Sequence, residues 1–282
     1  MQKENLFFFS FPRRSNFGEA RVTKKRGQNK INIPFICLSH YLFVPLHSNF
    51  WTICIRRVYM KTVYGYVIAY FVLLLAVLVL MYEYPKPELH MLLNSHHSSI
   101  QDTFFKYYTM LAEWPLYALA LLPLLWKKIK ITLFYAICEI TGGSILQLLK
   151  HLVSLDRPVS VFENYPQLTL PLVQGVDMHH SNSFPSGHAS TFFMFCTCLV
   201  IIEAYYYNRT NKSISKKKKA LFMMSLFSLF VLAAMGAYSR VYLSQHFLSD
   251  VCVGSIIGFV TPFLIFYFCR NKVLKLNKKE AN

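Results

Sequence analysis

Six long apolar stretches most constrain the fold of this chain. A helix that crosses the hydrocarbon core of a bilayer needs about 20 mostly apolar residues. Because backbone polar groups find no partners in lipid, such stretches fold as α-helices. The short alternating segments that would indicate a β-barrel do not occur in the sequence. The predicted spans are residues 62–82, 107–126, 130–150, 187–207, 220–238 and 247–269.

The distribution of positive charge predicts the orientation of these spans. The chain carries a formal net charge of +17 although 54% of its residues are hydrophobic, and its 30 Lys and Arg lie mainly between the apolar stretches. A nucleic-acid-binding domain would place them on amphipathic elements instead. All but five fall on one side of the six spans, which the positive-inside rule makes cytoplasmic. The five on the outward side are Lys86, Lys106, Lys150, Arg157 and Arg240.

The apolar pattern also divides the chain into three parts. Residues 60–270 form the predicted six-helix membrane domain, and residues 271–282 form a basic cytoplasmic tail. Residues 1–59 are a basic extension. Because Met60 is followed directly by Lys61 and the first span, as at a natural start, we expect the extension to be dispensable or not native to the protein. A basic arm lying at the membrane interface is the alternative.

A first polar cluster lies at the outward end of the third span. Lys150 and Arg157 are seven residues apart, and Pro158 follows directly. Seven residues are nearly two helical turns, so both cations are predicted to project from one helix face. Proline disfavours helical backbone in the residue before it, so the helix is predicted to end at Arg157.

A second cluster, Pro185-Ser186-Gly187-His188, lies at the start of the fourth span. A helix N-terminus offers free backbone N–H groups and a partial positive charge, which suit an anion. Gly187 allows close approach of the backbone, and the hydroxyl of Ser186 adds a donor. The cluster therefore predicts an anion site.

A third cluster, Ser239-Arg240 followed by His246 and Asp250, lies at the outward turn between the last two spans. His246 and Asp250 are four residues apart, so they share a helix face if the turn is helical. A carboxylate bonded to one imidazole nitrogen fixes the tautomer and leaves the other nitrogen free to attack.

Each cluster alone has an ordinary structural explanation. A single Lys or Arg at a helix end usually anchors the helix among lipid headgroups, and a single His is usually structural. All three clusters, however, fall on the outward side of a topology derived from other residues. We interpret them together as a phosphate site with cations, a helix start, a nucleophile and an acid. The predicted fold is an all-α, six-span transmembrane helical bundle with this site at the outward, periplasmic ends of its helices.

The three motifs resemble the complete signature of the type 2 phosphatidic acid phosphatase family. The resemblance covers about residues 60–270, and the order of the motifs and the six-span plan also agree. The matching motifs are Lys150-x6-Arg157-Pro158, Pro185-Ser186-Gly187-His188 and Ser239-Arg240-x5-His246-x3-Asp250.

This resemblance implies a reaction through a phosphohistidine. His246 would attack phosphorus while Asp250 orients its ring, and His188 would protonate the leaving group and later activate water. The implied phosphate ligands are Lys150, Arg157, Ser186, Gly187 and Arg240. Fixed cations can stabilise phosphoryl transfer as a metal does elsewhere. The sequence has no carboxylate cluster suited to Mg²⁺, so neither a metal nor another cofactor is expected.

The implied protein is a lipid phosphatase of the inner, cytoplasmic membrane whose active site faces the periplasm. Its substrate would be a lipid mono- or diphosphate, with undecaprenyl diphosphate, lipid A, phosphatidic acid and phosphatidylglycerol phosphate all open. A lipid phosphotransferase using the same intermediate is the alternative. Six spans disfavour a vanadate-haloperoxidase-like enzyme, and the intact motifs disfavour a non-catalytic lipid-binding protein. No nucleic-acid partner is expected, and the sequence indicates no oligomeric state.

Overall fold

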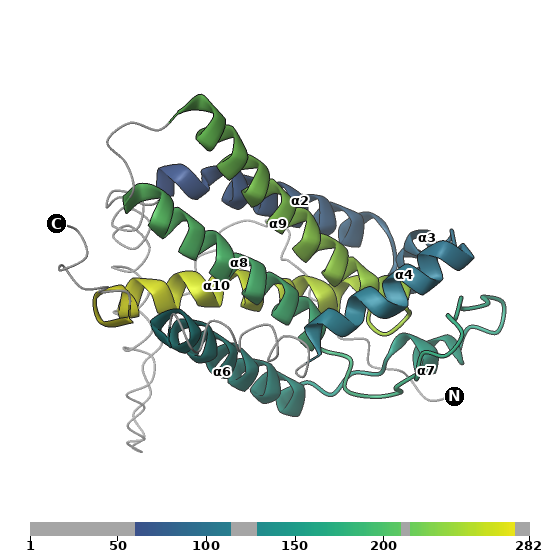
Figure 1. The fold of residues 1–282 in the computed structure, drawn as a ribbon. Helices are drawn as coiled ribbons and strands as arrows, with labels where there is room; N and C mark the ends of the chain where they lie inside the picture. Colours follow the sequence, from purple (N-terminus) through teal and green to yellow (C-terminus); the bar gives the residue numbers. More distant parts are fainter. Residues whose placement is uncertain (1–59, 114–128, 210–214, 274–282) are drawn as a thin grey trace, which may run out of the picture. The chain divides into compact units, whose positions relative to one another are not determined.

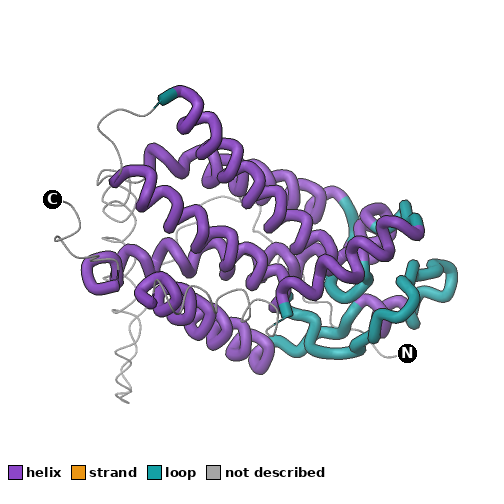
Figure 2. The backbone as a smooth tube through the Cα atoms, viewed as in Figure 1, coloured by secondary structure: helices purple, strands orange, loops and turns teal. Residues whose placement is uncertain are grey.

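The computed structural model describes residues 60–113, 129–209 and 215–273, and all of them are helices or loops (Figure 2). Five helices in these ranges are long and apolar enough to cross a membrane. No end of these five differs from the predicted one by more than four residues. The all-α class is therefore confirmed for the described residues. The five helices are α2 (Met60–Glu83), α6 (Ile129–Leu152), α8 (Gly187–Arg209), α9 (Lys216–Tyr242) and α10 (Leu248–Val273).

The remaining predicted span, at 107–126, lies largely outside the described residues. Its first residues belong to the end of α4 (Ser99–Thr109), to the 3₁₀ helix η1 (Met110–Ala112) and to Glu113, whose backbone is extended. The count of six spans therefore stays a prediction. The extension at 1–59 also lies outside the described residues, as does the predicted tail beyond the end of α10.

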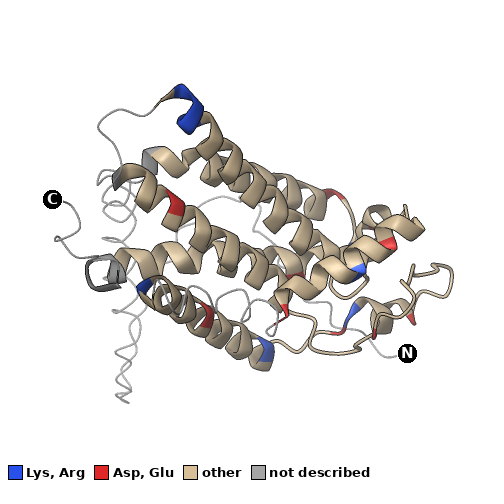
Figure 3. Ribbon diagram, in the orientation of Figure 1, with Lys and Arg blue, Asp and Glu red and all other residues tan. Residues whose placement is uncertain are grey.

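Short helices and loops gather at one end of the long helices, where α6 and α9 end and α8 and α10 begin (Figures 1 and 2). Besides α4, they include α3 (Lys86–Leu93) and α7 (Pro158–Phe162). Figure 3 shows a basic cluster, Lys216–Lys219 at the start of α9, at the opposite end. The two ends of the described bundle therefore differ in charge and in structure.

The short helices begin where the sequence supplies helix-starting residues. The hydroxyl of Ser98 accepts a hydrogen bond from the backbone N–H of Gln101, 3.3 Å away, at the start of α4, which is a standard N-cap. Pro158 is the first residue of α7, where its missing N–H costs nothing. Neither helix is long and apolar enough to resemble a membrane span, so neither was predicted from the sequence.

Among the long helices, α8 is the most enclosed. It packs against α6, α9 and α10 (Figure 1). Of its most apolar window, 61% is buried inside the protein, compared with 22% for α2. Val72 and Leu75 of α2 are about two-thirds exposed, which suits a helix that faces lipid because lipid tails are as apolar as these side chains.

Two glycines bring α10 into backbone contact with α8. Gly254 and Gly258 are four residues apart and lie on one face of α10. A Cβ on Gly254 would collide with the carbonyl oxygen of Ser186, and one on Gly258 would collide with the carbonyl oxygen of Ser190. Small residues at this spacing allow two membrane helices to approach closely. The contact therefore fixes the start of α8 beside the start of α10.

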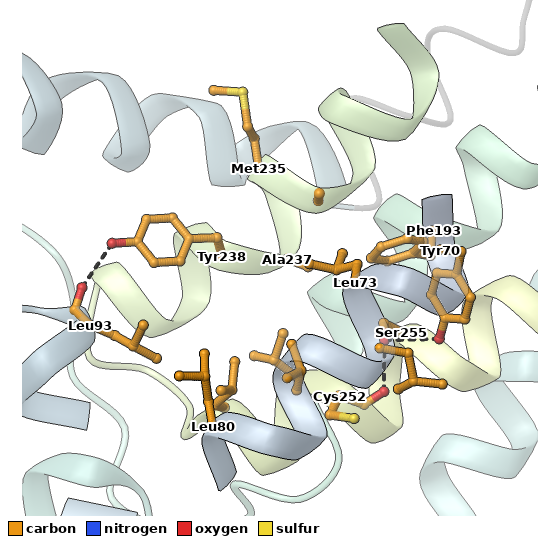
Figure 4. A pocket seen from close by; sticks show the side chains of 15 residues that line it. Tyr70, Leu73, Leu80, Leu93, Phe193, Met235, Ala237, Tyr238, Cys252 and Ser255 are labelled. Carbon is orange, nitrogen blue, oxygen red and sulfur yellow. Dashed lines mark hydrogen bonds between the residues drawn. The ribbon is translucent and has the colours of Figure 1, made fainter. Parts of the chain in front are cut away.

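The packing of α2 is looser. A cavity of about 390 Å³ lies among α2, α9 and α10, with Phe193 of α8 also in its wall (Figure 4). Its lining is almost entirely apolar, and the hydroxyl groups of Tyr70 and Ser255 in it bond to each other over 3.2 Å. Close backbone packing is thus concentrated between α8 and α10 and does not extend to α2.

We expect Gly258→Ala to lower the midpoint of thermal unfolding of the purified protein in detergent by about 4 °C or more, because the new Cβ would strike the backbone of α8. Ala otherwise stabilises a helix by about 1 kcal/mol relative to Gly. The matched control is Gly143→Ala in α6, where a Cβ would meet nothing within 4 Å and the midpoint should hold or rise. Equal midpoints for the two variants would contradict the proposed backbone contact.

Candidate active site

Charged and imidazole side chains from all three motifs lie around His246, which is in the turn between α9 and α10 and is 2% exposed. Three cations, Lys150, Arg157 and Arg240, act electrostatically on its imidazole, and so does His188. The structure therefore brings together residues from α6, α8, α9 and the loop after α6. Their chemical roles stay predictions.

His246 and Asp250 are linked by a serine rather than by a direct hydrogen bond. Nδ1 of His246 lies 3.9 Å from Oδ2 of Asp250, because His246 precedes α10 and only Asp250 belongs to its first turn. The hydroxyl of Ser183 donates to Oδ2 of Asp250 at 2.5 Å and lies 3.5 Å from Nδ1 of His246. The backbone N–H of Phe247 donates to the same oxygen at 3.1 Å. The carboxylate is thus held by a serine and a backbone group beside the imidazole.

The predicted position of Arg157, at the end of the third spanning helix, is wrong. The helix α6 ends at Leu152, and Arg157 has extended backbone and caps α7. The two cations of the first motif therefore do not share a helix face, and Pro158 begins a helix instead of ending one. The helical prediction failed because proline also favours the first turn of a new helix.

The guanidinium of Arg157 joins two loops. Its Nε donates to the carbonyl oxygen of Ser181 at 2.9 Å. Its Nη1 donates to the backbone and side-chain oxygens of Gln245 at 3.2 and 3.0 Å. Gln245 is the residue before His246, so this cation is fixed directly to the turn that carries His246. Burial lowers the pKa of Arg157, and the nearby carboxylate of Asp250 opposes that effect.

Arg240, in the last turn of α9, has two roles in the structure. Its Nη1 donates to the hydroxyl of Thr109 at 2.8 Å, while its buried Nε has no partner among the described residues. A buried donor without a partner is costly, so this group suits an anionic ligand. The backbone carbonyl of Arg240 accepts from the N–H groups of Gln245 and His246 at 3.0 and 3.1 Å. One residue therefore supplies a cation and anchors the turn.

The start of α8 completes the arrangement. The backbone N–H of Ser186 donates to the carbonyl oxygen of Asp250 at 3.0 Å, and its hydroxyl accepts from the N–H of Ala189 at 3.4 Å. The space in front of Gly187 is open, since a Cβ there would meet nothing within 4 Å. The free N–H groups of this helix start can therefore be approached by an anion.

The imidazole of His246 is kept neutral by its surroundings. Burial lowers its pKa well below the usual 6.5, and the positive charges of Arg240, Arg157 and Lys150 lower it further. A neutral imidazole has the free electron pair that nucleophilic attack requires. The site can thus combine an uncharged nucleophile with cations suited to a phosphate group.

Three residues of the site were not identified from the sequence: Ser183, Gln245 and Thr109. Ser183 lies just before the second motif and Gln245 just before His246, so proximity to a motif was the available signal for both. Thr109 carried no such signal, because its contact with Arg240 joins residues 131 positions apart.

Residues 131–274 match the family model described as the PAP2 superfamily. The match covers about half of the chain and contains every motif residue. The chain belongs to the PAP2 superfamily.

Two known proteins are similar to parts of this chain. Phosphatidylglycerophosphatase B of Bacillus subtilis (strain 168) is 35% identical over 89 residues. These residues are 31% of this chain and 40% of that protein, so the similarity spans well under half of the relative. The crystal structure of Aquifex aeolicus LpxE aligns with a TM-score of 0.44 and 21% identity, covering 64% of this chain and 93% of that one.

We expect Ser183→Ala to lower kcat about tenfold with little change in KM, as loss of a partner that orients a catalytic group typically does. The hydroxyl of Ser183 holds the Asp250 carboxylate beside His246. The matched control is Ser181→Ala, because the side chain of Ser181 is exposed and its backbone carbonyl would still accept from Arg157. Steady-state assays of phosphate release compare the two. Full kcat in Ser183→Ala would show that the serine does not support the pair.

The lowered pKa of His246 predicts where activity declines on the acidic side of the pH profile, its acidic limb. Since only the neutral ring attacks, kcat/KM controlled by His246 should decline only well below pH 6.5. Arg157→Gln removes a cation that favours the neutral ring, so the pKa should rise and the limb should move to higher pH. Lys106→Gln removes a cation that is not among the main causes of the lowered pKa of His246, so it should leave the limb in place. Ionisation of the substrate affects all variants in the same way. An equal shift of the acidic limb in Arg157→Gln and Lys106→Gln would therefore contradict the assignment of the limb to His246.

Proposed function

We propose that this protein is an integral-membrane phosphatase that hydrolyses a lipid mono- or diphosphate through a phosphohistidine on His246. The observation that carries the proposal is the convergence of Lys150, Arg157 and Arg240 on a buried, neutral imidazole. Membership of the PAP2 superfamily and the similarity to a phosphatidylglycerophosphatase support the same class of reaction.

In the first step, Nε2 of His246 attacks phosphorus and the bond from phosphorus to the lipid oxygen breaks. His188 gives a proton to the departing oxygen. Asp250, with Ser183 beside it, orients the ring from its Nδ1 side. Fixed charges stabilise the transition state because they need no reorganisation as charge moves onto the phosphoryl oxygens.

In the second step, water attacks the phosphohistidine and the bond between phosphorus and Nε2 breaks. His188 takes the proton of the water, which restores both histidines and releases phosphate. The three cations, the hydroxyl of Ser186 and the N–H of Gly187 hold the non-bridging oxygens throughout. Positioning and charge neutralisation account for most of the catalysis of phosphoryl transfer.

We place the activity in residues 60–270, in the inner membrane, with the site facing the periplasm. The distribution of Lys and Arg supports this orientation, because Lys216–Lys219 lie at the opposite end of α9 from Arg240 (Figure 3). On this proposal residues 1–59 and the basic tail are not needed for chemistry, since every motif residue lies between them.

The test is a panel of four purified lipids presented in detergent micelles to the full-length protein. Phosphatidylglycerol phosphate comes first because the relative is named for it, followed by phosphatidic acid, lipid A and undecaprenyl diphosphate. At least one should release phosphate, with chelator having no effect and vanadate inhibiting as a mimic of five-coordinate phosphorus. His246→Ala should reduce release by about a thousandfold or more, whereas His151→Ala, at an exposed position at the end of α6, should not.

Three results would argue against the proposal. Near-normal release by His246→Ala would remove the nucleophile, and silence after chelation would require a metal. Phosphate transferred to an added lipid or alcohol, with none released to water, would identify a phosphotransferase instead.

A further inference from the structure

The short helix α3 presents three side chains toward the turn that carries His246. Lys86, His90 and Asn94 are spaced four residues apart, so they share one face of α3 and its C-terminal cap. His90 and Asn94 are each only 1% exposed. Polar side chains buried this deeply are costly unless they make hydrogen bonds. Their bonding partners therefore indicate what the helix does.

Both buried side chains contact Ser244, two residues before His246. Nδ2 of Asn94 donates to the hydroxyl oxygen of Ser244 at 3.0 Å and to the carbonyl oxygen of Val241 at 2.9 Å. Nε2 of His90 lies 3.3 Å from the same hydroxyl, which donates to the carbonyl oxygen of Pro171 at 2.9 Å. Ser244 has a φ of 52°, and a left-handed backbone is strained at a non-glycine residue. These contacts hold the turn in that conformation.

The same face of α3 also contacts Phe247, the residue after His246. The ring of His90 packs edge-on against Phe247 with 5.2 Å between centroids. Nζ of Lys86 lies 4.1 Å from the centroid of the Phe247 ring, within the range of a cation–π contact. Burial, with the added charge of Lys86, lowers the pKa of His90 to about 4, so its ring is neutral there. The helix α3 thus contacts residues on both sides of His246 in the sequence.

The helix itself is fixed to α9. The hydroxyl of Tyr238 donates to the carbonyl oxygen of Leu93 at 2.8 Å (Figure 4). Together with the bond from Asn94 to Val241, this ties the end of α3 to the last turns of α9. Tyr238 lies in the turn before Arg240, and Val241 lies in the same turn as Arg240. The helix α3 is therefore anchored to the part of α9 that carries Arg240.

We propose that α3 positions the nucleophile, with Asn94 and His90 as positioning residues that act on His246 through Ser244 and Phe247. Neither belongs to the three motifs. The inference rests on the proposed function in that His246 is taken as the nucleophile. A shift of about 1 Å in a reacting group can cost a hundredfold in rate, so holding this turn contributes to kcat and not to the affinity for substrate.

The first test separates positioning from binding. Asn94→Ala should lower kcat about 10- to 100-fold while KM changes less than about twofold. The control is Ser95→Ala, at the adjacent exposed residue, which should leave both kcat and KM unchanged. At His90 the amide of Gln reaches the position of Nε2, which faces Ser244, whereas that of Asn reaches only Nδ1, which has no partner in the described part of the chain. His90→Gln should therefore retain kcat and His90→Asn should lose it. Equal kcat in these two variants, or an unchanged kcat in Asn94→Ala, would overturn the proposal.

A second measurement does not depend on activity. Amide hydrogen exchange in residues 241–247 should be faster in Asn94→Ala and His90→Asn than in the wild type, and unchanged in Ser95→Ala and His90→Gln. Exchange that is unaltered in the first two variants would also overturn the proposal. If the wild type releases phosphate from no lipid, the proposed function fails while this exchange test still decides the role of α3. If Asn94→Ala does not fold, the two His90 variants decide it.

Discussion

The geometry of the site depends on the contact between the backbones of α8 and α10. Gly254 and Gly258 allow the two helices to approach until main-chain atoms touch. At the start of this contact the N–H of Ser186 donates to the carbonyl of Asp250. The start of α8 and the carboxylate beside His246 are therefore held together by groups that no side-chain rotation can separate. A larger side chain at either glycine would push the two helix starts of the candidate site apart.

The long helices could be predicted from the sequence because hydrocarbon leaves a spanning segment only one local solution. The predicted stretch at 187–207 and the observed α8 begin at the same residue, since Gly187 follows Pro185-Ser186 and begins a mostly apolar stretch. The meeting of motif side chains at one end of the bundle could also be predicted, because each motif lies at the end of such a stretch; their chemical roles stay predictions. Composition and spacing therefore carried most of the information about where the site would form.

Residues whose positions depend on tertiary contacts could not be predicted. The backbone position of Arg157 was predicted wrongly because a proline that ends one helix can equally begin another. Which of the two occurs depends on the loops to which the guanidinium of Arg157 donates. Ser183 and Asn94 are ordinary polar residues in the sequence. Their importance arises only when the chain places them beside Asp250 and Ser244. Periodicity does not report contacts of this kind.

At Arg240 the main chain and the side chain have separate functions. The backbone carbonyl accepts from the N–H of His246, whereas the guanidinium of the same residue contacts Thr109 and has an Nε that no described residue pairs. A change of side chain at this position removes charge but leaves the anchoring carbonyl in place. The positive charge of the site can therefore vary independently of the position of His246. A small cation such as free guanidinium, supplied from solution, would then restore the missing charge to an otherwise intact backbone framework.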